Sequence, residues 1–137
     1  VINNLTLLSQ LRAVPAEFIV LSGDDAITLP LMAVGGLGVI SVASNEVPRE
    51  MSLMVEAAER GDFAAARKIH ASLMPLMLIN FVESNPIPVK AAMAAMGLLE
   101  ETYRLPMVSP RPESRARIQA VLSDLRLLSA ASARVSA

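Results

Sequence analysis

Two adjacent carboxylates, Asp24 and Asp25, are the residues of this chain best suited by type and position to chemistry. They follow Gly23 and the run Phe-Ile-Val-Leu-Ser at 18–22, and an apolar, β-branched run closed by glycine predicts a buried strand. Paired carboxylates just after a strand could bind a polar substrate or act as acid and base. A simpler role is also open, because either carboxylate could cap the helix predicted over 26–34.

Other candidate groups are few. A helix is predicted over 62–82, with one buried apolar stripe formed by Phe63, Ala66, His70, Leu73, Met77 and Phe81. The position of His70, the sole histidine, on this stripe favours a packed histidine over a metal ligand. Lys68 and Lys90 are the only lysines, and both fall in predicted helices or their connectors rather than at a strand end, where a lysine nucleophile would be expected. Cysteine is absent, which excludes disulfides and thiolate chemistry. No metal site is therefore predicted.

The elements that must position the carboxylates form one βαβ unit. The strand at 18–22 and the helix at 26–34 lead through a glycine-rich turn to a second apolar run, Val-Ile-Ser-Val at 39–42. Two unalternating strands joined by a helix predict a parallel sheet, whose carboxyl edge carries the loop at 23–25. Further helices are expected over 4–14, 48–59, 62–82, 89–96 and 112–128, with a connector at 85–88 and a fraying tail at 129–137.

Composition narrows the class of partner. The net charge of −1 without a basic cluster argues against nucleic acid. The mean hydropathy of +0.49 is high, and the uncharged window 26–45 has the length of a membrane span. Pro30 and three glycines split that window into a helix and a strand, so no membrane segment is predicted, and no signal peptide is visible. Apolar faces normally covered by other protein account for the hydropathy.

Four motifs in order carry a family resemblance. They are Leu-Ser-Gly-Asp-Asp at 21–25, the run 29–42, Asn-Pro-Ile-Pro-Val-Lys at 85–90 and Arg-Leu-Pro-Met at 104–107. Over about residues 4–128 the chain resembles the dihydrodipicolinate (4-hydroxy-tetrahydrodipicolinate) synthase family, pyruvate-dependent class I aldolases of the acetylneuraminate lyase type. The resemblance implies the C-terminal part of a (β/α)8 TIM barrel, an α/β fold. Residues 1–61 would form its last βα units, 62–128 an all-α C-terminal helical domain and 129–137 a flexible tail.

The resemblance also implies a reaction and a site. The family condenses pyruvate with aspartate semialdehyde in lysine biosynthesis, without metal or organic cofactor. Gly23, Asp24 and Asp25 match the loop that lines the aldehyde pocket, and Ile40 matches the residue whose backbone carbonyl faces bound pyruvate. A cytoplasmic homotetramer is implied, with Leu5, Thr6 and Val34 near one subunit interface.

The Schiff-base lysine of the family is expected upstream of Val1, so no catalytic residue is assigned within this chain, and Tyr103 is not expected to be the family's proton relay. The chain by itself is predicted to be inactive. Two alternatives stay open: a truncated, non-catalytic relative that acts as a binding or assembly module, and part of another pyruvate aldolase, such as a keto-sugar-acid or acetylneuraminate lyase.

Overall fold

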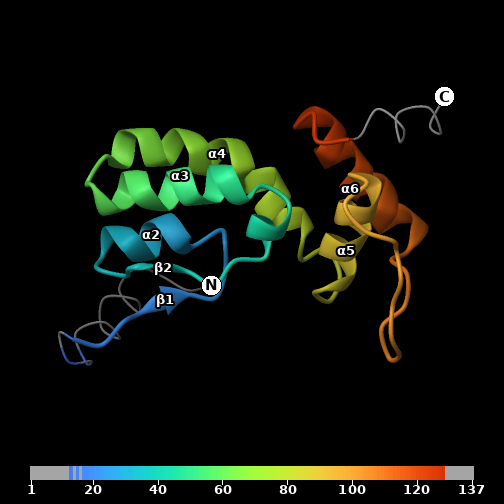
Figure 1. Cartoon of the computed structure of the whole chain (residues 1–137), viewed down its shortest axis with the longest axis horizontal. Coiled ribbons are helices and arrows are strands. Elements are labelled where there is room, and N and C mark those ends of the chain that lie inside the picture. Colours follow the sequence, from blue (N-terminus) through green and yellow to red (C-terminus); the bar gives the residue numbers. More distant parts are fainter. Residues whose placement is uncertain (1–12, 14, 16, 129–137) are drawn as a thin grey trace. The chain divides into compact units, whose positions relative to one another are not determined.

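The computed structural model describes residues 13, 15 and 17–128 (Figure 1). The chain divides into two compact units, Val1–Met74 and Pro75–Ala137, which are described separately. The predicted tail at 129–137 and nearly all of the predicted helix at 4–14 lie outside the described residues. The boundary expected near residue 61 is a different one, between the barrel and the helical domain, and it stays a prediction.

The first unit contains the predicted parallel βαβ arrangement. β1 (Leu21–Ser22) and β2 (Gly38–Val39) pair in parallel, with Leu21 opposite Gly38 and Ser22 opposite Val39. Helix α2 (Thr28–Ala33) connects them and contacts both strands. The parallel pairing predicted from two unalternating apolar runs is therefore confirmed.

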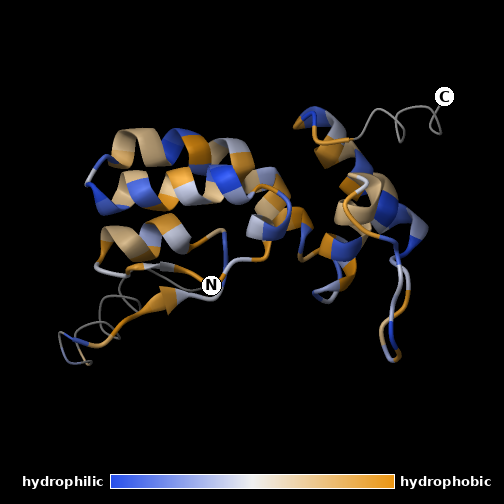
Figure 2. Ribbon diagram, viewed as in Figure 1, coloured by the Kyte–Doolittle hydropathy of each residue, from blue (hydrophilic) through white to orange (hydrophobic). Residues whose placement is uncertain are grey.

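Both strands are shorter than predicted, and the first is less buried. Phe18 and Ile19 are 61% and 65% exposed, so the prediction of a buried strand over 18–22 is wrong at its start. Among the described residues β1 has β2 as its one paired neighbour, and a two-stranded ribbon leaves much apolar surface uncovered. Figure 2 shows that the segment leading into β1 and the start of the strand are nevertheless strongly apolar.

Helix α2 begins later than predicted, and neither carboxylate caps it. Its N-cap is Ile27, without a side-chain cap, so the prediction that Asp24 or Asp25 fills this position is wrong. The reason is Pro30, which becomes the third helical residue when the helix starts at Thr28. In the first turn its missing N–H costs no hydrogen bond. The two carboxylates are thereby left for other partners.

Two helices complete the first unit as the capping residues predict. α3 (Pro48–Glu59) has its predicted bounds and ends before Gly61, whose φ is +78°. The Asp62 carboxylate then accepts a hydrogen bond from the Ala65 amide at 3.0 Å, at the start of α4 (Phe63–Ile79). A short 3-10 helix, η1 (Ala43–Asn45), contacts α3, and α2 packs on α3.

Helix α4 runs across the division between the two units and ends at Ile79 rather than at the predicted Val82. Ala66, Leu73 and Met77 of the predicted stripe are buried. Phe81 is 45% exposed, so its predicted burial is wrong, because the helix that would place it on the stripe has already ended.

The second unit contributes α5 (Ile87–Ala95) and α6 (Pro112–Asp124), which pack on each other. α5 begins two residues before the predicted Val89. Pro88 occupies its second position, where proline is tolerated, so the prediction that the connector extends to Pro88 is wrong. Gly97 ends the helix with a φ of +78°, and its amide bonds to the Ala94 carbonyl, as expected for a C-terminal glycine.

The N-terminus of α6 is capped by a distant side chain. The Glu83 carboxylate accepts a hydrogen bond from the Arg111 amide at 2.9 Å, just before the helix begins at Pro112. The Ser114 hydroxyl and this amide lower the pKa of Glu83. Pro112 starts the helix as predicted, and Ile118 and Leu122 lie in the core. Within the described part of the chain, no helix is long and apolar enough to cross a membrane.

Candidate functional site

The four predicted site residues lie at one edge of the parallel sheet. Gly23, Asp24 and Asp25 follow β1 directly, and Ile40 follows β2. The Ile40 amide donates a hydrogen bond of 2.8 Å to the Ser22 carbonyl, which extends the strand pairing by one step. The carboxyl ends of both strands therefore meet here, as the parallel topology requires.

A tight turn holds Asp24 at the surface. The Ser22 hydroxyl donates to the Asp24 carbonyl at 2.6 Å and accepts from the Asp24 amide at 3.1 Å. The Asp24 carboxylate accepts from the Ala26 amide at 2.8 Å, which closes an Asx turn. The side chain remains exposed, so a ligand at this edge can reach it.

Asp25 is in the opposite environment, with 1% of its surface exposed. Its Oδ2 accepts two backbone hydrogen bonds, from Val42 at 3.0 Å and from Ala43 at 2.9 Å. Its Oδ1 is buried and has no hydrogen-bond partner among the described residues. The carboxylate therefore connects the loop after β1 to the segment after β2, at the start of η1.

Two further side chains support the loop from inside the unit. The Thr28 hydroxyl donates to the Asp24 carbonyl at 3.0 Å, and Nε2 of His70, on α4, bonds to the Ala26 carbonyl at 2.9 Å. A carbonyl only accepts, so Nε2 must carry the proton. Sequence reasoning missed both contacts. A hydroxyl in a first helical turn is a usable signal for Thr28, but nothing local marks His70 as a partner of Ala26.

The structure offers no metal centre in the residues it describes: no group of three or more His, Asp or Glu side chains is gathered there. His70 is half-buried and bonded to the backbone, in line with the packed rather than the ligating interpretation.

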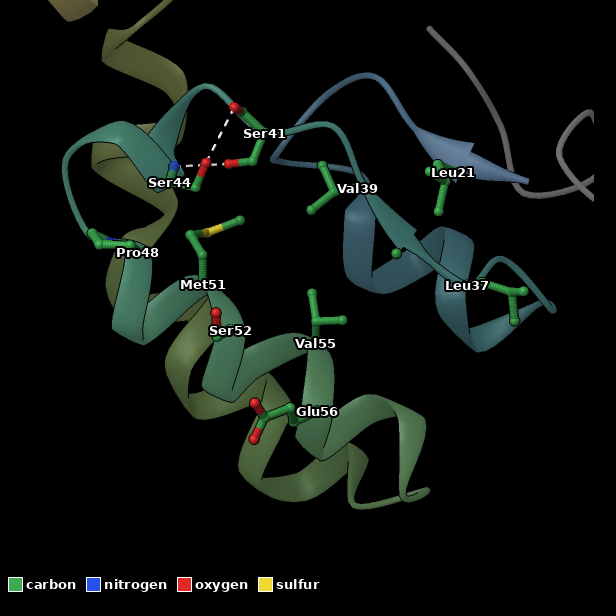
Figure 3. A pocket seen from close by; sticks show the side chains of 11 residues that line it. Leu21, Leu37, Val39, Ser41, Ser44, Pro48, Met51, Ser52, Val55 and Glu56 are labelled. Carbon is green, nitrogen blue, oxygen red and sulfur yellow. Dashed lines mark hydrogen bonds between the residues drawn. The ribbon is translucent and has the colours of Figure 1, made fainter. Parts of the chain in front are cut away.

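A groove lies beside β2, between this strand and α3 (Figure 3). Its volume is about 620 Å³. The lining mixes apolar side chains with three serines and Glu56. It consists of Leu21, Leu37, Gly38, Val39, Ser41, Ser44, Pro48, Met51, Ser52, Val55 and Glu56. Leu21 and Leu37 are 42% and 60% exposed, so apolar surface continues from the groove to the strands.

The second unit holds a separate cluster of polar side chains. Arg115 binds both oxygens of Glu101, at 2.7 and 2.5 Å, and the Tyr103 hydroxyl donates to Glu101 at 2.9 Å. The hydrogen bonds of Arg115 lower the pKa of Glu101, while burial and the Glu101 carboxylate raise the pKa of Tyr103 to about 12. The Lys90 ammonium lies 5.2 Å from the centre of the Tyr103 ring and donates to the Thr102 carbonyl. These contacts bind the segment between α5 and α6 to both helices.

Comparison with known proteins agrees on one family. Residues 1–125 match the profile of the Dihydrodipicolinate synthetase family. The 4-hydroxy-tetrahydrodipicolinate synthase of Koribacter versatilis is 56% identical over 114 residues, which are 83% of this chain and 38% of that protein. The crystal structure of dihydrodipicolinate synthase from Aquifex aeolicus superposes with a TM-score of 0.89 at 42% identity, over 95% of this chain and 44% of that one.

A third relative carries a ligand. The dihydrodipicolinate synthase of Acinetobacter baumannii, solved in complex with pyruvate, superposes with a TM-score of 0.87 at 32% identity. The superposition covers 92% of this chain and 43% of that one. The chain thus spans about two-fifths of the length of the curated relatives it matches. With a family profile matched from residue 1 to residue 125 and the parallel βαβ unit in place, this chain belongs to the Dihydrodipicolinate synthetase family.

Proposed function

We propose that this chain is the C-terminal portion of a 4-hydroxy-tetrahydrodipicolinate synthase, an enzyme that condenses pyruvate with aspartate semialdehyde in lysine biosynthesis. The observation that carries the proposal is the family match over residues 1–125, together with relatives that bear this activity in their names. The portion would comprise the last two strands of a (β/α)8 barrel and a C-terminal helical domain. The intact enzyme would be a cytoplasmic homotetramer without a cofactor.

The substrate-binding edge would be formed by Gly23, Asp24, Asp25 and Ile40. Its position at the carboxyl ends of β1 and β2 supports this, because parallel α/β sheets and barrels bind their ligands at that edge. Asp24 is the exposed carboxylate there, and the main chain at Ile40 is bonded to the end of β1. A carboxylate and main-chain carbonyls suit a polar, hydrogen-bonding substrate.

The chain would supply binding groups rather than the nucleophile. In the proposed reaction a lysine amine adds to the keto group of pyruvate and water leaves, which forms an imine; loss of a proton then gives the enamine that attacks the aldehyde. Lys68 is exposed on α4, and Lys90 lies on α5 with its ammonium donating to the Thr102 carbonyl. Neither lysine directly follows β1 or β2, where the parallel topology would present an amine at the carboxyl edge of these strands.

A second candidate function, a non-catalytic assembly module, is favoured by the groove beside β2. The exposed leucines Leu21 and Leu37 line it. A strand edge beside exposed apolar side chains is a template for association. In this role the chain would bind the complementary portion of a synthase without taking part in its chemistry.

Two measurements test these functions. In the first, the purified chain is treated with pyruvate and borohydride and its intact mass is measured, with the Aquifex aeolicus synthase as positive control. We expect no pyruvyl adduct on the chain; an adduct on Lys68 or Lys90 would overturn the argument about the nucleophile.

In the second, the chain is co-expressed with the remaining N-terminal portion of the Koribacter versatilis synthase. Condensing activity that depends on this chain is expected if it forms part of the site. Stable association without activity, with the N-terminal portion still trapping pyruvate, would favour the assembly module.

A further inference from the structure

Two neighbouring carboxylates at the end of β1 have separate environments. Asp24 is exposed and bonds to the Ala26 amide, two residues along the chain. Asp25 is 1% exposed and bonds to Val42 and Ala43, 17 and 18 residues away. Only Asp24 has a carboxylate surface that a ligand could contact, and only Asp25 makes long-range contacts.

Hydrogen bonds hold the main chain at Ile40 and just beyond it. The Ile40 amide is bonded to the Ser22 carbonyl at 2.8 Å. Just beyond it, the Val42 and Ala43 amides converge on one oxygen of Asp25. Three hydrogen bonds thus hold residues 40–43 against residues 22–25, so this segment cannot move from the end of β1 unless they break.

These bonds join two parts of the proposed substrate-binding edge. A buried carboxylate that accepts two N–H groups makes strong, charge-assisted hydrogen bonds, which fix geometry better than neutral ones. The side chain of Ile40 is 70% exposed and therefore does little to hold the segment by packing. The Ile40 main chain is therefore held by its own bond to the Ser22 carbonyl and by the bonds that the Val42 and Ala43 amides donate to Asp25 just beyond it.

Building on the function proposed above, in which Asp24 is the exposed carboxylate of the substrate-binding edge, we propose that Asp25 is a positioning residue rather than a substrate contact. Asp25 holds the main chain of residues 40–43 at the substrate-binding edge. The two adjacent aspartates therefore have distinct tasks, and substitutions at the two positions affect different measurable quantities.

Amide hydrogen exchange in the 137-residue chain tests the positioning role without any activity. In Asp25→Ala we expect the Val42, Ala43 and Ile40 amides to exchange at least about tenfold faster, since a lost charge-assisted bond is worth that factor or more. Asp25→Asn keeps an acceptor oxygen and should stay within about threefold of the wild-type rates. Asp24→Ala is the matched control and should accelerate only the Ala26 amide.

Two outcomes of this experiment would overturn the proposal. Unchanged exchange at Ile40 in Asp25→Ala would mean that the carboxylate does not control the segment. Loss of protection throughout α3 in the same variant would mean that Asp25 serves the folding of the whole unit rather than the position of one segment.

Kinetics in the co-expressed enzyme test the division of tasks. Asp25→Ala should lower kcat about 10- to 100-fold, because misplacing binding groups by about 1 Å has effects of that size, and Asp25→Asn should restore most of it. Asp24→Asn should instead raise the KM for the aldehyde about tenfold. An unchanged kcat in Asp25→Ala would refute the proposal. An inactive wild-type complex would count against the proposed function, while the exchange rates would still decide the role of Asp25.

Discussion

Ionisation of Tyr103 can be followed by itself, because the chain contains one tyrosine and no tryptophan. The phenol is half-buried and donates a hydrogen bond of 2.9 Å to Glu101. Burial and the adjacent carboxylate both disfavour a phenolate and raise the pKa of Tyr103 to about 12. At pH 11 we therefore expect about one-tenth of the phenol to be ionised, against about nine-tenths for a tyrosine with the usual pKa of about 10.

The substitution Glu101→Gln tests this account. The pKa of Tyr103 is measured in both proteins from the ultraviolet absorbance of the phenolate between pH 8 and pH 13. Removing the carboxylate charge should lower the pKa of Tyr103, yet keep it above the ordinary value, because burial is the largest cause of the shift. Glu100→Gln is the matched control: Glu100 is exposed and should leave the midpoint unchanged. A wild-type midpoint near 10, or an equal response to both substitutions, would refute this account of the cluster.

The same shift determines how stability depends on pH. The folded phenol keeps its proton up to about pH 12, whereas the unfolded one releases it near pH 10, so the folded state binds more protons between these values. The free energy of unfolding of the second unit should therefore fall as the pH rises from about 10 to about 12. Tyr103→Phe has no phenol to titrate, so its Tm should fall less over this range. Equal declines for both proteins would contradict the assignment.

Substitutions at three positions test other features of the structure through urea or thermal unfolding. His70→Ala removes the bond to the Ala26 carbonyl and should lower stability by about 1 kcal/mol, with a smaller loss for His70→Gln; equal losses would argue against the bond. Gly36→Ala would place a Cβ 2.6 Å from a side-chain carbon of the buried Leu31 and should destabilise the first unit by about 1–3 kcal/mol; an unchanged Tm would show that Leu31 moves freely. Arg126→Gly relieves a residue at φ +58° just after α6 and should stabilise the second unit by about 0.5–1 kcal/mol; destabilisation would mean that the arginine side chain matters more than its backbone strain.

Sequence predicted the elements well where the signal was local. Pro48, Gly61 and Asp62 set the end points around α3 and α4, and Gly97 and Pro112 did so for α5 and α6. Each acts through its own backbone geometry or a bond within the next few residues, so the pattern contains the cause.

Predictions failed where a second element decides the outcome. Phe18 lies in a run, residues 18–22, whose composition is typical of a buried strand. Its burial, however, depends on neighbouring elements that this run cannot specify. Pro88 was assigned to the connector, yet it lies within the first turn of α5 because the helix start adjusts around it. Glu83 caps α6 across 28 residues, a distance over which no sequence pattern signals a cap.

The aspartate pair shows the limit most clearly. The sequence was enough to place both aspartates at the carboxyl edge of the sheet, because they directly follow a strand that pairs in parallel. The different environments of the two carboxylates could not be predicted from the sequence, because they depend on the bend at residues 23–25, which leaves Asp24 exposed and turns Asp25 into the unit. The inward one, Asp25, meets the Val42 and Ala43 amides only because β2 pairs in a register that brings them there. A shift of register by one residue would separate Asp25 from both amides, so its bonds depend on the same pairing that brings Ile40 to the end of β1.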